Sequence, residues 1–397
     1  MNYENWISYR YLKAKKGRFL AFLNFVSIAG VAIGVMALII VIGVMEGFGN
    51  NLREKIIGTT PHIVIEKETG IQDYKKVQEK IKDIEGIVSS SPYVQGNVFL
   101  EEKGSALGQV VRGIDPLTES NVTKVKEYLV KGDIKDLARD GIIIGSELAR
   151  YFGLQIGDPV TVISPGSGLK GHGWRYQLAV AGIFNTGMVD FDTNLVLIHI
   201  QKAQEMFGYA KEKASGIGIK IENPYQAKDI KNKIYETLGY SFLVRTWIDV
   251  NRSLFEALFL EKWGLFIILT LMVIVAAFNI VSTLVVTVSS KTHDIGILKS
   301  FGVSQAAIRR IFTNQGVFIG MVGVFWGLIA GLGISYILGH YVKVPEQIYS
   351  IKHVPVDIQL SDILIIIAAA MFISFLATIY PAYKAAKMEP VEALRYE

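Results

Sequence analysis

The chain has 397 residues, of which 51% are hydrophobic and 19% are charged, and its mean hydropathy is +0.35. Soluble globular chains carry roughly 25% charged residues, so this composition excludes an ordinary soluble protein and indicates a membrane protein. The formal net charge is +5 and there is no cysteine. Any exported part of the chain must therefore be stable without disulfide bonds.

Four long stretches of the chain contain no charged side chain. A hydrocarbon core about 30 Å thick is crossed by roughly 20 apolar residues in a helix. We therefore predict four transmembrane helices, at residues 20–45, 263–290, 311–339 and 363–383. The first stretch is too long for the core of a signal peptide and is expected to remain in the protein as an anchor.

Lys and Arg residues concentrate on one side of these predicted spans. They are frequent in residues 1–19, 291–310 and 384–397, whereas the short loop 340–362 has only two. By the positive-inside rule, both termini are predicted to be cytoplasmic, and residues 46–262 are predicted to face the outside. The high pI reports this topology and is no evidence for nucleic-acid binding.

The large segment 46–262 mixes short β-branched runs with amphipathic helical stretches. The fold class is therefore a four-helix membrane protein with a large α+β extracytoplasmic domain, expected to have two lobes, inserted between the first two spans. Strands are predicted at residues 62–66, 94–101, 110–114, 141–144, 160–164, 177–183, 195–198 and 217–222, and helices at 73–83, 146–152, 201–207 and 225–238.

Both helices that flank the domain are predicted to project beyond the bilayer. The stretch 248–290 has few helix breakers and is interpreted as one long helix. The first span is expected to continue through Phe48, Leu52 and Ile56 beside it. Such a pair would form a rigid stalk able to carry force.

Motifs for chemistry are weak. Gly166, Gly168 and Gly171 satisfy G-x-G-x-x-G, but residues 173–183 read as a strand, whereas nucleotide binding needs a helix there. Residues 164–175 are better interpreted as a long hairpin loop, either structural or binding. There is no Walker A, H-E-x-x-H or G-x-S-x-G motif and no His cluster at ligand spacing. We therefore predict a non-enzymatic chain without a metal.

The predicted spans contain no ionisable residue, which disfavours a secondary transporter or a channel. They do contain small residues at helical spacing, which predicts close helix packing or, alternatively, a sliding surface. Asn24 and Asn279 are expected to form interhelical hydrogen bonds. The spaced glycines are Gly30, Gly34, Gly316, Gly320, Gly323, Gly327 and Gly331.

Two cytoplasmic segments are amphipathic. Residues 1–19 mix aromatic and basic side chains, as expected of a helix in the membrane interface. Residues 291–310 begin with a short apolar and charged segment that is either a membrane-surface turn or a docking helix for a cytoplasmic partner.

This order of elements resembles the permeases of the MacB and FtsX superfamily of ABC transporters, most closely the lipoprotein-releasing (Lol) permeases. The strings that carry the resemblance are GVMALIIVIGVMEGFGNNLREKIIG from Gly34, KTHDIGILKSFGVS from Lys291 and YPAYKAAKMEPVEALRYE from Tyr380. A weaker part is GIIIGSELARYFGLQIGDPVTV from Gly141.

The resemblance implies a permease subunit of the bacterial inner membrane whose domain 46–262 is periplasmic. Such a subunit extracts triacylated lipoproteins from the outer leaflet and passes them to a periplasmic carrier. A separate cytoplasmic ABC ATPase, which binds the ATP and Mg, supplies the energy, and a second permease, identical or homologous, completes the complex. No cofactor is expected in this chain.

The resemblance also implies roles for particular residues. In the family, a hairpin loop of the exported domain binds the carrier, and residues 164–175 lie at the corresponding place, but their Gly-rich sequence departs from the family's pattern. ATPase coupling is expected at Lys291, Asp294, Ile295, Ile297, Leu298, Lys299 and Phe301; lipoprotein contact at Met45, Phe48, Leu258, Phe259, Tyr349 and Ile351; and carrier binding at Pro165, Lys170, Trp174 and Arg175.

Three other functions remain open from the sequence. An FtsX-like mechanotransmitter would relay ATPase motion to an exported hydrolase without transporting anything. A MacB-like efflux permease would usually carry its ATPase in the same chain, which this sequence lacks. A membrane receptor or adhesin would only bind its partner.

Overall fold

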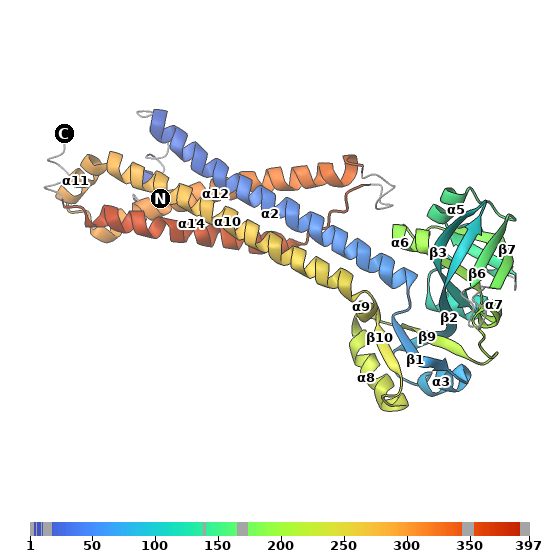
Figure 1. Ribbon diagram of the computed structural model, residues 1–397. Coiled ribbons are helices and arrows are strands. Elements are labelled where there is room, and N and C mark those ends of the chain that lie inside the picture. Colours follow the sequence, from blue (N-terminus) through green and yellow to red (C-terminus); the bar gives the residue numbers. More distant parts are fainter. Residues whose placement is uncertain are drawn as a thin grey trace. The chain divides into compact units, whose positions relative to one another are not determined.

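The structure is a computed structural model that describes residues 4, 6–8, 10, 18–137, 140–164, 174–343 and 353–389 (Figure 1). It consists of two compact units. The helical unit contains the chain up to Gly49, Ala257–Lys343 and the chain from His353 onward. The second unit contains Asn50–Glu256 and is referred to below as the domain.

Four long helices carry the predicted spans, and each is long and apolar enough to cross a membrane. A short helix, α11 (Thr292–Ser300), connects the second and third. The first helix is continuous to Thr59, as the sequence predicted. The four are α2 (Arg18–Thr59), α10 (Arg252–Ser290), α12 (Gln305–Tyr341) and α14 (Leu360–Lys387).

The predicted glycine packing is confirmed on α12. A Cβ at Gly323 would lie 2.7 Å from Val31 of α2, and one at Gly320 would lie 2.6 Å from Ser374 of α14. Because a side chain fits at neither position, α12 approaches both neighbours closely. Gly316 repeats the contact with α14, and Gly327 and Gly331 repeat the contact with α2.

Hydroxyl groups connect α2 to α10. Ser27 Oγ lies 2.6 Å from Thr283 Oγ1 and donates to the main-chain oxygen of Asn279 at 3.2 Å. Asn24 is buried, but its Oδ1 has no hydrogen-bond partner in the described part of the chain. The prediction for Asn24 is therefore wrong at that atom.

The domain contains one mixed sheet of ten strands with short helices between them. The strands are β1 (Ile63–Ile71), β2 (Ile87–Glu102), β3 (Ser105–Ile114), β4 (Leu129–Gly132), β5 (Gly141–Gly145), β6 (Pro159–Ser164), β7 (Trp174–Phe184), β8 (Leu195–His199), β9 (Ala214–Ile221) and β10 (Leu243–Thr246). The helices are α3 (Tyr74–Ile81), α4 (Pro116–Val122), α5 (Ser146–Phe152), α6 (Val189–Asn194), α7 (Ile200–Met206), α8 (Ala227–Leu238) and α9 (Trp247–Val250).

Six of these strands close into a barrel. The pairs run β2–β3, β3–β8, β8–β5, β5–β7, β7–β6 and β6–β2, which returns to the first strand. Closure removes exposed edges. A buried apolar cluster that includes Val98, Val111, Ile144 and Val196 fills this barrel lobe.

Three of the other four strands form a second, open lobe with part of β2, whereas β4 pairs with the barrel strand β7. Here β10, β1, β9 and the first half of β2 pair in that order, and α3 and α8 pack their apolar sides on a cluster that includes Ile63, Ile217 and Trp247. Both lobes share β2, the longest strand. The prediction of an α+β domain with two lobes agrees with this arrangement.

The segment that precedes the second span is not one helix. Thr246 and Asp249 form a capping box that starts α9, and α9 ends before Asn251, so α10 begins only at Arg252. The sequence analysis also missed the four-residue strands β4 and β10 and the short helices α4 and α6.

Candidate functional site

The connecting helix α11 has a buried side that packs on three of the long helices. Ile295 is 1% exposed and belongs to a cluster with Val288 of α10, Phe312 of α12 and Ala385 of α14. Gly296 next to it is also buried. The buried side of α11 is therefore in contact with α10, α12 and α14.

The opposite side of α11 is open. Phe301 is 82% exposed and Ile297 is 37% exposed. The helix ends at Ser300, and Gly302, with a φ of +85°, turns the chain toward α12. Ser304 caps α12 by accepting from the Ala307 amide at 3.3 Å. An exposed phenylalanine at such a turn is an apolar contact point without a partner in the described chain.

The charged residues of α11 bond within the helical unit. Lys291 Nζ lies 2.9 Å from Asp294 Oδ2. Lys299 Nζ donates to the main-chain oxygens of Ala386, at 2.8 Å, and Met388. Because the last carbonyls of a helix lack helical partners, Lys299 stabilises the end of α14. Of the seven residues expected to couple to an ATPase, Ile297 and Phe301 are the most accessible, and the role of all seven stays a prediction.

The four predicted lipoprotein-contact residues of α2 and α10 differ in exposure. Met45, Phe48 and Leu258 are half-buried, whereas Phe259 is 65% exposed. Phe259 begins an edge-to-face series of rings, with its centroid 6.2 Å from that of Trp263, which in turn lies 5.7 Å from that of Phe266. The rings of Trp263 and Phe266 were not among the residues predicted to contact the lipoprotein.

Much more of α10 than of its neighbours is accessible. Only 6% of the most apolar stretch of α10 is buried, whereas the corresponding share is 33% in α12 and 28% in α2. A membrane helix with so little packing inside its own chain leaves a broad apolar face for lipid, substrate or another chain.

The segment that enters α14 packs on α2 at Gly43 and Gly47. A Cβ at Gly43 would lie 2.6 Å from Ile358, and the Gly43 carbonyl accepts from the Asp357 amide at 2.9 Å. Gly47 is equally close to the Pro355 backbone. The predicted contact residues Tyr349 and Ile351 lie outside the described residues.

The hairpin between β6 and β7 has an exposed aromatic base. Trp174 is 67% exposed, and Phe99 on the neighbouring strand β2 is 54% exposed. Arg175 forms an ion pair of 3.1 Å with Glu101 across the same strands. Pro165 and Lys170, the other two residues predicted to bind a carrier, lie outside the described residues.

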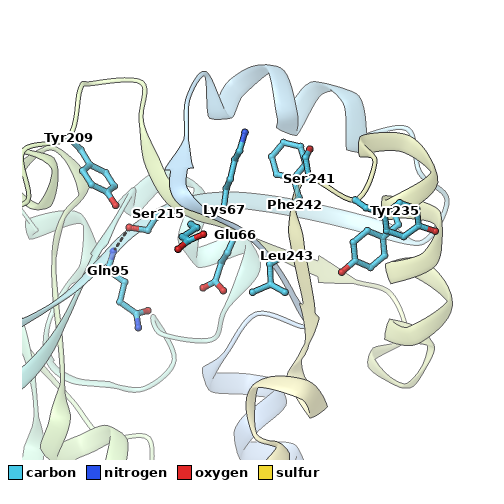
Figure 2. Close-up of a pocket in the computed structure, with 11 residues that line it drawn as sticks. Glu66, Lys67, Gln95, Tyr209, Ser215, Tyr235, Ser241, Phe242 and Leu243 are labelled. Carbon is cyan, nitrogen blue, oxygen red and sulfur yellow. Dashed lines mark hydrogen bonds between the residues drawn. The ribbon is translucent and has the colours of Figure 1, made fainter.

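The domain also has an open groove of about 770 Å³ (Figure 2). Tyr209, Tyr235, Tyr240 and Phe242 contribute most of its aromatic surface. Its lining contains neither His nor Cys, and Glu66 is bonded to Arg245 and, at 2.7 Å, to the Tyr93 hydroxyl. No group of metal-ligating side chains occurs among the described residues.

Comparison with known proteins assigns this chain to a family. Residues 24–236 match the MacB-like periplasmic core domain, and residues 266–390 match the FtsX-like permease C-terminal domain. The lipoprotein-releasing system transmembrane protein LolC of Neisseria meningitidis is 37% identical over 99% of both chains. LolC of Xylella fastidiosa is 30% identical over 98% of both, and LolE of Haemophilus influenzae is 27% identical over 99% of both.

The chain belongs to the LolC and LolE family. The resemblance seen in the sequence is therefore confirmed over the full length. The relatives are named transmembrane proteins, which agrees with the four long apolar helices.

Proposed function

We propose that this chain is the permease subunit of an ABC transporter that releases lipoproteins from the bacterial inner membrane. The observation that carries the proposal is full-length similarity to proteins named lipoprotein-releasing, together with an α11 that is exposed on one side and packed on three long helices on the other. The chain would hydrolyse nothing, and a separate ATPase would bind ATP and Mg.

The exposed side of α11 is the proposed docking site for that ATPase. Ile297 and Phe301 offer an apolar contact, and the buried Ile295 connects it to α10, α12 and α14. A push on α11 would then move three helices at once. This requires α11 and both termini to be cytoplasmic, and the domain to be periplasmic, as the distribution of basic residues favours.

The proposed path for the lipoprotein runs along the outer half of α10. Each acyl CH₂ group removed from lipid costs about 0.8 kcal/mol, so the protein must offer other apolar surface during extraction. The rings of Phe259, Trp263 and Phe266 form such a surface. Aromatic side chains are stiff and present a large apolar area.

The hairpin base is the proposed contact for a periplasmic carrier. Trp174 and Phe99 are exposed apolar side chains on strands of the rigid barrel lobe. Apolar side chains exposed on a rigid scaffold are typical of protein interfaces.

The test is reconstitution of the purified complex in proteoliposomes with a triacylated lipoprotein and a soluble carrier. We expect ATP-dependent transfer of the lipoprotein to the carrier. We also expect Ile297→Glu combined with Phe301→Glu to remove the ATPase from the purified complex, while His293→Glu, an exposed polar position on the same helix, retains it. ATP hydrolysis without any release would instead favour a mechanotransmitter.

A further inference from the structure

The outer end of α2 is seated in the domain at three points. Ile56 is fully buried in the apolar cluster of the open lobe. The Gly58 carbonyl accepts from the Lys124 amide at 2.8 Å. Lys55 Nζ donates to the carbonyl of Gly187 at 2.6 Å. The last contact reaches the loop between β7 and α6, so α2 contacts both lobes of the domain.

The loop that receives Lys55 is held firmly. Asp192 of α6 is 1% exposed, and its carboxylate accepts from the Thr186 amide at 2.8 Å, the Thr186 hydroxyl at 2.9 Å and the Gly187 amide at 3.2 Å. Asn185 Oδ1 accepts from the same Gly187 amide at 2.9 Å. Gly187 has a φ of +72°, which suits glycine. The carbonyl that Lys55 meets is therefore fixed in position.

Lys55 also lies near the buried carboxylate of Asp192. Burial lowers the pKa of Lys55, and electrostatic attraction to Asp192 opposes this shift. Gly145 at the end of β5 has no space for a Cβ against the Asp192 backbone, so α6 packs directly on a barrel strand. A displacement of Lys55 would reach the barrel through few intermediate atoms.

We propose that Lys55 is a positioning residue that makes the barrel lobe follow α2 during the transport cycle. The inference rests on the proposed function. α2 is one continuous helix from Arg18 to Thr59 without a proline, so the helix itself connects its membrane segment to Lys55. A hydrogen bond from a charged donor, held in a partly buried site, then couples helix and barrel.

The experiment compares Lys55→Met, Lys55→Arg and the control Arg53→Met in the reconstituted complex with its ATPase. Arg53 lies on the same helix and donates to Asn50 Oδ1, three residues away, at 3.1 Å. We expect Lys55→Met to lower lipoprotein release per ATP hydrolysed by about tenfold, as the loss of one charged hydrogen bond allows. Lys55→Arg should restore the ratio, and hydrolysis and thermal stability should match Arg53→Met.

Two outcomes separate this inference from the proposed function. If the unmodified complex releases no lipoprotein, the proposed function is wrong. If it does, and Lys55→Met releases as much per ATP, Lys55 does not couple α2 to the barrel. A parallel fall in hydrolysis, stability and release would show a merely structural role and also overturns the inference.

A second measurement does not depend on the Lys55 variants. The chain has no cysteine, so spin labels can be attached at Glu54→Cys on α2 and Asp190→Cys on α6, both exposed. We expect the distance between the labels to be the same in nucleotide-free and ATP-bound complexes. A shift larger than the width of the distribution would show that α6 does not follow α2, and would overturn the inference even if Lys55→Met fails to assemble.

Discussion

Two membrane helices of similar length have opposite surroundings. α10 has 39 residues and α12 has 37, and both are apolar enough to cross a membrane. Nevertheless, α12 packs its glycines on α2 and α14, whereas α10 leaves most of its apolar surface exposed. Hydropathy alone identifies both as spans, but glycine spacing distinguishes the scaffold helix α12 from α10, whose outer half is the proposed working surface.

The largest expected effect is the loss of stability when a glycine position of α12 is filled. Gly316→Leu would overlap Thr378 on α14, and we expect a loss of at least about 3 kcal/mol, the upper end of overpacking costs. The measurement is the yield and thermal stability of the purified protein. Gly333→Leu on the same helix is the control, because a Cβ there meets nothing within 4 Å. Equal loss in both variants would contradict the scaffold role.

A substitution on the exposed face of α10 should lower lipoprotein release without lowering the stability of the protein. Phe259→Asp places a charge on the exposed aromatic face, which should lower lipoprotein release about tenfold because the acyl chains would meet a carboxylate. Stability and ATPase binding should be unchanged. Tyr341→Asp, at an exposed aromatic position near the end of α12, is the matched control and should release normally.

A substitution at Lys299 tests how α11 is attached to the end of α14. Lys299→Met removes the donor to the Ala386 and Met388 carbonyls and should destabilise the helical unit by about 1–2 kcal/mol, allowing for its partial exposure. Thermal unfolding in detergent measures this loss. Lys384→Met, an exposed lysine on α14, should cost nothing measurable.

The smallest expected effect lies in the domain. Burial lowers the pKa of His62, which bonds to the Ile221 backbone through Nδ1. The folded state thus disfavours the protonated ring, so this contribution to stability is present above about pH 6.5 and is lost as the pH falls below it. Between pH 7.5 and 5.5, the thermal stability of His62→Gln should fall less steeply than that of the unmodified protein. The two slopes should differ by no more than about 1.4 kcal/mol per pH unit. An identical slope in both proteins would exclude His62 as the cause.

Local patterns in the sequence predicted the spans, the glycine packing and most strands, because each depends on residues a few positions apart. Barrel closure could not be predicted, since strands pair through their backbones and nothing in the sequence of β6 shows that both β2 and β7 are its neighbours. At the candidate site, the apolar residues of α11 were identifiable, but Ile295 and Ile297 differ only in which side meets the bundle. The role of Lys299 depends on carbonyls near residue 387, far along the chain. Phe99 and Lys55 carried no signal that set them apart.

Photo-cross-linking of a lipoprotein in the complex with its ATPase tests most sharply whether the substrate contacts α10. Benzoylphenylalanine replaces Phe259 on α10 or, in a separate sample, Tyr341 on α12, both exposed aromatic positions. We expect an ATP-sensitive cross-link to the lipoprotein from position 259 and none from position 341. Equal cross-linking from both positions, or none from position 259 in a complex that releases lipoprotein, would contradict the claim that α10 is the surface along which the substrate leaves the membrane.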